Sequence, residues 1–151
     1  MEDNTTRELI SAPERAMHFA TIAHGGQIYN DEVPYVVHLQ AVVTVLKRFG
    51  FSDPVMECAG FLHDTIEDTN TSYKKIATKF GTSVAELVFA VTSEMGRNRA
   101  EKNAKTYPKI RGNDLATALK LADRIANVEY GMATDGGKRD MYVKELSLIH
   151  I

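Results

Sequence analysis

Residues 61–69 read Phe-Leu-His-Asp-Thr-Ile-Glu-Asp-Thr and place four titratable side chains in an otherwise apolar helical stretch. Polar groups in a buried helix cost free energy unless they are paired or bind something, so the pattern indicates a functional site. His63 and Asp64 are consecutive, and consecutive side chains on a helix point about 100° apart. Both can bind one ion only if it lies at the helix edge and other helices supply further ligands.

Glu67 and Asp68 follow one helical turn after His63 and Asp64, respectively, and are expected to overhang the same site. A carboxylate one turn from a metal ligand lies within hydrogen-bond reach of water at the ion, which is where a general base acts. The acidic pair is therefore a candidate for proton transfer beside the ion.

Two further polar residues, His38 and Asp123, stand in hydrophobic stripes and can complete the ligand set. Imidazole and carboxylate ligands suit Mn, Fe or Zn better than Ca, and four protein ligands leave positions for water and a phosphate oxygen. A divalent ion held in this way lowers the pKa of water and neutralises charge that develops on phosphorus. Singly, such residues are more often hydrogen-bonded structure than ligands, so the prediction depends on the combination.

Helices must position these side chains, and caps and glycines mark their ends. Ser11, followed by Pro13 and Glu14, predicts a helix over residues 11–24, which Gly25 ends. Apolar spacing predicts helices over residues 36–49, 52–68, 72–80, 83–95, 97–110 and 114–130, and a last one from about residue 137. The valines of 36–49 could also form a strand, but the length favours a helix. Short connections without repeats predict an all-α, single-domain bundle over residues 1–151.

The two ends of the chain depart from this pattern. Residues 1–10 are expected to be loosely ordered. Residues 146–151, Leu-Ser-Leu-Ile-His-Ile, are an abrupt apolar ending, so we expect an atypical C-terminus in which the last helix packs differently or is cut short. We assign no function to His150.

The composition excludes several classes of protein. The 151 residues carry 18 Lys and Arg against 20 Asp and Glu, and this balance gives no electrostatic footprint for nucleic acid or an anionic membrane. The single cysteine, Cys58, allows neither a disulfide framework nor a cysteine zinc site. The N-terminus resembles no signal peptide, and no run reaches about 18 apolar residues, so we expect a cytoplasmic protein. The oligomeric state stays open.

Taken together, the motifs resemble the hydrolase domain of the RelA/SpoT alarmone proteins, and especially the stand-alone Mesh1-type small alarmone hydrolases, both members of the HD superfamily. The resemblance covers residues 16–145. It is carried by Ala-His-Gly-Gly-Gln at 23–27, Pro-Tyr-Val-Val-His at 34–38, the segment 61–69, Phe-Gly at 80–81 and Lys-Leu-Ala-Asp-Arg-Ile-Ala-Asn at 120–127. Their order and spacing make the resemblance specific.

The resemblance implies an HD-type helical bundle that holds a manganese ion, with Glu67 and Asp68 as the catalytic pair that orients or deprotonates attacking water. The implied metal ligands are His38, His63, Asp64 and Asp123. In that family the reaction removes pyrophosphate from the 3′ position of guanosine tetra- or pentaphosphate. The implied partner is therefore a small-molecule nucleotide.

The resemblance also implies substrate contacts. Asn127 lies one turn after Asp123 and matches the family asparagine that contacts the sugar and phosphate of the nucleotide. Tyr29 and Asn30 stand where alarmone hydrolases usually carry Arg-Lys. This change removes two positive charges, although a tyrosine ring can still stack on a base.

Lys120 and Arg124 flank the implied metal ligand Asp123 and complete the predicted substrate-binding set. Each either binds phosphate, offsets the charge of the aspartate or is a solvated helix-face charge. Two alternative functions stay open. The same site could act on another nucleotide or phosphate ester, or the chain could be a non-catalytic nucleotide-binding module. The second alternative is disfavoured because a binding module has no evident need for the acidic pair.

Overall fold

The computed structural model describes residues 10–134 and 139–150, and there the chain is almost entirely helical. The helices are α2 (Ala12–His24), α3 (Tyr35–Arg48), α4 (Pro54–Leu62), α5 (Thr65–Asp68), α6 (Tyr73–Phe80), α7 (Thr82–Val91), α8 (Arg99–Arg111), α9 (Asp114–Thr134) and α10 (Arg139–His150). A short hairpin of β1 (Ile28–Tyr29) and β2 (Val33–Pro34) joins α2 to α3. The predicted all-α fold class is confirmed. The predicted loose order of residues 1–10 concerns positions that, except for residue 10, lie outside the described residues. The predicted start of the last helix near residue 137 also lies outside them.

Several helices begin and end where their capping residues predict. The Ser11 hydroxyl accepts the backbone N–H of Glu14 at 3.3 Å, and the Ser72 hydroxyl accepts that of Lys75 at 3.1 Å. Gly25 ends α2 with φ 54°, a left-handed conformation that costs glycine little. As a result, the predicted bounds of α2, α3 and α6 agree with the structure to within a residue at each end.

The predicted helix over residues 52–68 is wrong in one respect, because it is two helices. Asp64 leaves the helical region with φ −101° and ψ 0°, so α4 ends at Leu62 and α5 begins at Thr65. Side chains take the carbonyls that a continuous helix would use: His63 Nδ1 donates to the Gly60 oxygen at 2.8 Å, and the Thr65 hydroxyl donates to the Leu62 oxygen at 2.7 Å. Such side-chain bonds compete with the helical ladder.

Other boundaries differ as well. α7 ends at Val91 rather than at Met95, because Thr92 turns to an extended conformation. α8 continues past Pro108 to Arg111. Because the proline lies in the last turn, it removes only one N–H donor near the end of the helix. α9 continues past the predicted stop at Gly131, and α10 packs along it. In each case tertiary packing or a single dihedral angle, rather than local propensity, decides where the helix ends.

The segment between Gly25 and β2, predicted as a loop, contains the antiparallel hairpin, in which Tyr29 pairs with Val33. The turn residues Asn30 and Asp31 have φ of 49° and 58°. Asn and Asp are enriched in this left-handed region because their short polar side chains bond locally. The hairpin contacts α3 and buries Tyr29 against it.

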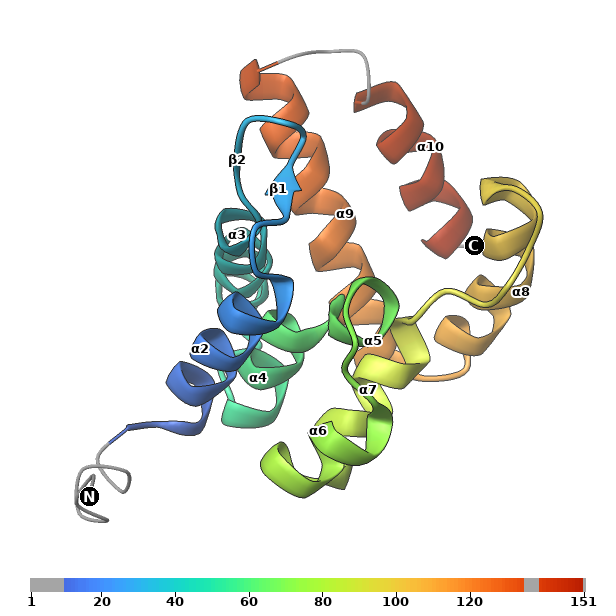
Figure 1. Ribbon diagram of the computed structural model, residues 1–151. Helices are drawn as coiled ribbons and strands as arrows, with labels where there is room; N and C mark the ends of the chain where they lie inside the picture. The colour runs from blue at the N-terminus through green and yellow to red at the C-terminus, as the bar shows by residue number, and fades with distance from the viewer. Residues whose placement is uncertain (1–9, 135–138, 151) are drawn as a thin grey trace.

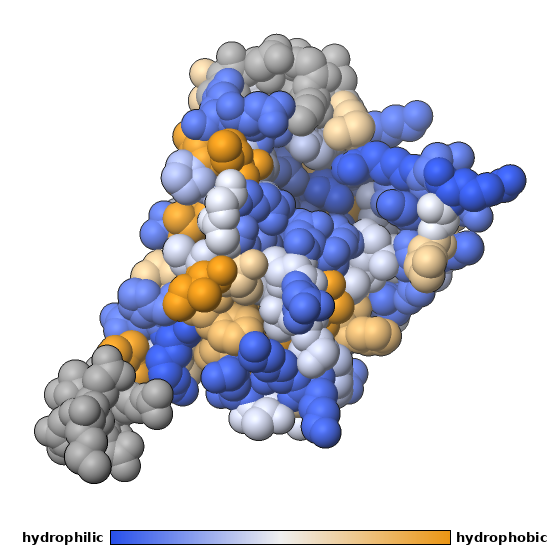
Figure 2. Space-filling model, in the orientation of Figure 1, coloured by the Kyte–Doolittle hydropathy of each residue, from blue (hydrophilic) through white to orange (hydrophobic). Residues whose placement is uncertain are grey.

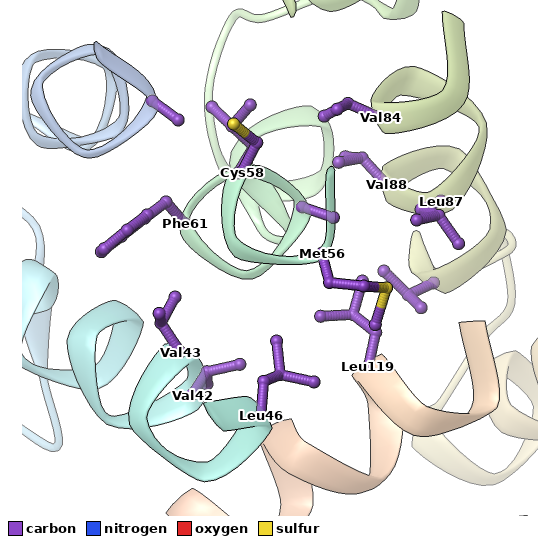
Figure 3. Packing of buried hydrophobic residues seen from close by; sticks show 14 of the residues in the cluster. Val42, Val43, Leu46, Met56, Cys58, Phe61, Val84, Leu87, Val88 and Leu119 are labelled. Carbon is purple, nitrogen blue, oxygen red and sulfur yellow. The ribbon is translucent and has the colours of Figure 1, made fainter. Parts of the chain in front are cut away.

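The hydrophobic core is centred on α4 (Figure 3). Met56, Cys58 and Phe61 point from this helix in different directions. The surrounding layer consists of Val42, Val43 and Leu46 from α3, Val84, Leu87 and Val88 from α7, and Leu119 from α9. Full burial of side chains of this size contributes about 1.5–3 kcal/mol each. Burial raises the pKa of the Cys58 thiol to about 11, so this cysteine is a packing residue.

Gly60 lets α3 and α4 approach closely. A Cβ atom at this position would lie 2.8 Å from Cγ2 of Val43 and 3.1 Å from Cδ1 of Leu46, closer than packed atoms allow. Because of this close crossing, the imidazole rings of His38 on α3 and His63 at the end of α4 lie with their centroids 5.4 Å apart.

The hairpin and α3 lie on one side of α9, and α10 and α8 lie on the other (Figure 1). The break between α4 and α5 faces the middle of this arrangement. Among the described residues, no helix combines the length and apolar character needed to cross a bilayer.

Candidate active site

The four side chains predicted as ligands meet where α3, α9 and the break after α4 come together. Nε2 of His38 lies 2.9 Å from Oδ1 of Asp123. Nε2 of His63 lies 3.0 Å from Oδ2 of Asp64 and 3.4 Å from Oδ1 of Asp123. Neighbouring ligand atoms around one divalent ion, each held at about 2.1 Å, lie about 3 Å apart. The cluster therefore has the donor atoms and the spacing of a divalent metal site.

The hydrogen bonds of His63 leave one nitrogen available for an ion. Nδ1 donates to the carbonyl oxygen of Gly60 at 2.8 Å, so Nε2 is the nitrogen that can bind a proton or an ion. Nε2 is buried and makes no hydrogen bond, although carboxylate oxygens of Asp64 and Asp123 lie close to it. Two buried carboxylates that face this nitrogen require a positive charge between them, which a proton on Nε2 or a metal ion bound to it supplies.

Neighbouring charges set the ionisation of the cluster. Burial alone would raise the pKa of Asp123, but Arg124 and Lys120 hold it well below its ordinary value. Burial also opposes ionisation of Asp64, and His63 nevertheless lowers the pKa of this carboxyl. In return, burial lowers the pKa of His63, whereas Asp64 and Asp123 raise it and prevail. Both aspartates are thus ionised and favour a bound cation.

Glu67 and Asp68 lie at the exposed side of the cluster. Carboxylate oxygens of Asp64, Glu67 and Asp68 lie within 4.8 Å of one another. The backbone N–H of Ser93 donates to Glu67 at 2.7 Å, and the Gln27 amide donates to Asp68 at 3.5 Å. Burial and the carboxylates of Asp64 and Glu67 raise the pKa of Asp68. Both side chains can accept a proton from water that enters the cluster.

Sequence reasoning missed Gln27, Tyr35 and Ser93, which support these carboxylates directly. Besides Gln27 and Ser93, the Tyr35 hydroxyl donates to Oδ2 of Asp64 at 2.5 Å. Burial and Asp64 raise the pKa of Tyr35, so the hydroxyl remains a donor. His24 donates from Nδ1 to the Gln27 side-chain oxygen at 2.9 Å. Gln27 and Tyr35 lie within the motifs at 23–27 and 34–38, which was an available signal, whereas nothing in the sequence marks Ser93.

Lys120 and Arg124 are buried on the far side of Asp123. The Lys120 ammonium lies 3.4 Å from Oδ2 of Asp123, and Nη1 of Arg124 donates to the same oxygen at 3.0 Å. Nε of Arg124 also lies 2.8 Å from the carboxylate of Glu145. Both cations thus offset the charge of the aspartate, one of the alternatives that the sequence left open. They also line the cavity described below.

Tyr29 and Asn127 lie side by side at the edge of the cluster. The Tyr29 hydroxyl donates to Oδ1 of Asn127 at 2.5 Å, and Nδ2 of Asn127 donates to Oδ1 of Asp123 at 3.4 Å. The ring of Tyr29 stacks on the imidazole of His38 with centroids 4.6 Å apart and planes at 12°. Asn30 stays in the hairpin turn and is not among the residues that line the cavity.

A cavity of about 640 Å³ opens over the cluster. Its far wall is formed by Arg99, Lys102 and Asn103 from α8 and by Tyr142 from α10. Hydrophilic residues cover most of the face between the hairpin and α8 (Figure 2). A polar cavity of this size accommodates a molecule as large as a nucleotide.

Comparison with known proteins agrees with this geometry. A family described as "HD domain" matches residues 16–149. A protein of Aquifex aeolicus named guanosine-3′,5′-bis(diphosphate) 3′-pyrophosphohydrolase is 35% identical over 144 residues, or 91% of this chain. A Streptomyces coelicolor protein named GTP pyrophosphokinase is 35% identical over 133 residues, or 85% of this chain. The chain spans 20% and 15%, respectively, of the length of these two relatives.

A solved structure shows the same fold over nearly the whole chain. It is a metazoan ortholog of SpoT, described as a protein that hydrolyses ppGpp and plays a role in starvation responses. The two structures superpose with a TM-score of 0.79 and 26% sequence identity, over 93% of this chain and 84% of the other.

Proposed function

The chain belongs to the HD domain family, and on this premise we propose that it is a manganese-dependent hydrolase that removes pyrophosphate from the 3′ position of guanosine tetra- or pentaphosphate, (p)ppGpp. One observation carries the proposal: the donor atoms of two histidines and two aspartates converge beside an acidic pair, under a cavity of nucleotide size. The names of the relatives and the similarity to the SpoT ortholog support the choice of substrate.

The chain's own residues would hold the ion and move the proton. A divalent ion, when bound by His38, His63, Asp64 and Asp123, supplies Lewis-acid chemistry toward water and phosphoryl oxygens. Glu67 and Asp68 orient the attacking water and accept its proton. As the water oxygen forms a bond to phosphorus, the bond from that phosphorus to the 3′ oxygen breaks. The 3′ oxygen takes up a proton from the acidic pair, and pyrophosphate leaves.

The wider assignment follows from the same features. We propose that residues 1–151 act as a single domain, that the ion is Mn²⁺, and that the protein acts in the cytoplasm on a small nucleotide, without nucleic acid or membrane partners. The near balance of 18 basic and 20 acidic residues supports the last point, because nucleic acid and anionic membranes require a basic surface.

A panel of nucleotides tests the substrate. The chain is incubated with Mn²⁺ and ppGpp, pppGpp, GTP, nucleoside monophosphates and dinucleotide phosphates, and both phosphate and pyrophosphate release are measured. Release of pyrophosphate and GDP from ppGpp, without turnover of GTP, is the expected result. If the folded, metal-loaded protein hydrolyses no nucleotide, it is a binding module instead.

A second candidate is an HD phosphohydrolase for a less highly charged nucleotide. Three of the four cations that line the cavity, Arg99, Lys120 and Arg124, are each paired with a carboxylate of the chain. This pairing reduces the charge available to a substrate with two diphosphate groups. Preferential turnover of a monophosphate or a dinucleotide phosphate in the same panel would favour this candidate.

Addition of Mn²⁺ is expected to stabilise the fold. An ion that binds only the folded state adds about 2.7 kcal/mol at a free concentration 100 times its Kd, which raises the Tm of a domain of this size by roughly 5 to 10 °C. Differential scanning fluorimetry with and without a chelator measures the shift. Asp64→Asn removes one ligand charge and is the matched control, since its Tm should not respond to Mn²⁺. An equal response in both proteins would contradict the assigned site.

A further inference from the structure

Tyr29 connects two of the four candidate ligands although it lies on neither of their helices. We infer that this tyrosine is a positioning residue that fixes the orientation of His38 and, through Asn127, of Asp123, and that it does not serve as a platform for the nucleotide base. The inference rests on the metal site of the proposed function. It reassigns a residue that the sequence places in substrate binding.

The ring of Tyr29 is too enclosed to receive a base. It is 7% exposed. One face stacks on His38, and the rings of Tyr35 and Tyr130 meet it edge to face with centroids 6.1 and 4.8 Å away. Stacking of a base would require one of these rings to leave.

The orientation of His38 depends on this stacking. A metal-binding histidine is normally oriented by a hydrogen bond from its second ring nitrogen to a neighbouring acceptor. Nδ1 of His38 is buried and has no hydrogen-bond partner. The nearly parallel ring of Tyr29 therefore holds the imidazole plane, together with the edge-to-face ring of Tyr35 at 5.6 Å, so that Nε2 points to Asp123 at 2.9 Å.

The hydroxyl of Tyr29 acts on the second ligand. It donates to Oδ1 of Asn127, which fixes the amide of this buried side chain so that its Nδ2 faces Asp123. If the amide turned over, its oxygen would face the carboxylate and the two would repel each other. Oδ2 of Asp123 is already occupied by Lys120 and Arg124, so Asn127 controls the direction of Oδ1, the oxygen that faces the histidines.

Isothermal titration with Mn²⁺ of the full chain tests the inference. Tyr29→Phe keeps the stacking and removes the hydroxyl, whereas Tyr29→Leu removes both. Loss of groups that orient metal ligands weakens metal binding by about 10- to 100-fold, so we expect about tenfold for the first variant and more for the second. Tyr73→Phe is the matched control, because its hydroxyl also donates to a side-chain oxygen at 2.5 Å, that of Glu86, on the exposed surface.

The outcomes separate positioning from substrate binding. Circular dichroism and the Tm without metal show whether each variant is folded. If Tyr29→Leu does not fold, the conservative variant Tyr29→Phe still tests the inference. Unchanged Mn²⁺ affinity of Tyr29→Phe would overturn the inference, and so would a variant whose only defect is a raised KM for the nucleotide at saturating Mn²⁺. A wild-type chain that binds Mn²⁺ but hydrolyses nothing would refute the proposed function alone, since the titration still measures the role of Tyr29.

Discussion

The double variant Glu67→Gln, Asp68→Asn is expected to lower kcat for pyrophosphate release by about 10²–10⁴-fold, the range that positioned general bases contribute. The amides preserve shape but cannot accept the proton of the attacking water. Mn²⁺ affinity should change little, because neither side chain belongs to the four ligands. Steady-state kinetics with the substrate found in the nucleotide panel, together with titration of Mn²⁺, measure both quantities.

A matched control variant makes this result specific to the acidic pair. Glu86→Gln with Asp114→Asn removes the same charge from exposed carboxylates that do not line the cavity, so its turnover should match the wild type. If the Glu67, Asp68 variant kept wild-type turnover, the proton path would lie elsewhere. If it lost Mn²⁺ binding instead, the two carboxylates would be ligands rather than a base.

The sequence predicts well which polar side chains the fold brings together, because a buried polar residue in an apolar stripe stands out. His38 and Asp123 are recognisable in this way on α3 and α9, and the structure brings them together with His63 and Asp64. The same reasoning predicts one helix through residues 52–68 and so misses the break at Asp64. No residue there disfavours a helix strongly, and the break is stabilised by side-chain bonds to the Gly60 and Leu62 carbonyls that become visible only in the fold.

The surroundings of the ligands are harder to predict because their partners are distant in sequence. The bond from Tyr29 to Asn127 joins residues 98 positions apart, and the bond from Ser93 to Glu67 joins residues 26 apart. The type of a residue indicates what it can donate or accept, but not which partner it meets. Tyr29 and Asn127 therefore look like substrate contacts in the sequence, whereas in the structure they contact His38 and Asp123.

Glu145→Ala is expected to lower the free energy of unfolding by about 3–5 kcal/mol, the cost of leaving one member of a buried ion pair without its partner. Glu145 on α10 is 4% exposed and its carboxylate lies 2.8 Å from Nε of Arg124, which is itself buried. It also accepts two hydrogen bonds from the guanidinium of Arg99 on α8. The variant thus leaves a guanidinium buried beside Asp123 with only that carboxylate to offset it. Urea unfolding, checked for two-state behaviour, measures the loss.

Glu129→Ala is the matched control for this loss. It removes a carboxylate that pairs with Arg48 at 2.5 Å, but both side chains are 49% exposed, and such surface pairs contribute at most about 1 kcal/mol. A loss of the same small size at Glu145 would show that water or another group replaces the carboxylate, and that α10 is held on α9 by apolar contacts alone. A large loss would show that α10 stabilises the candidate metal site, since Arg124 joins Glu145 directly to the proposed ligand Asp123.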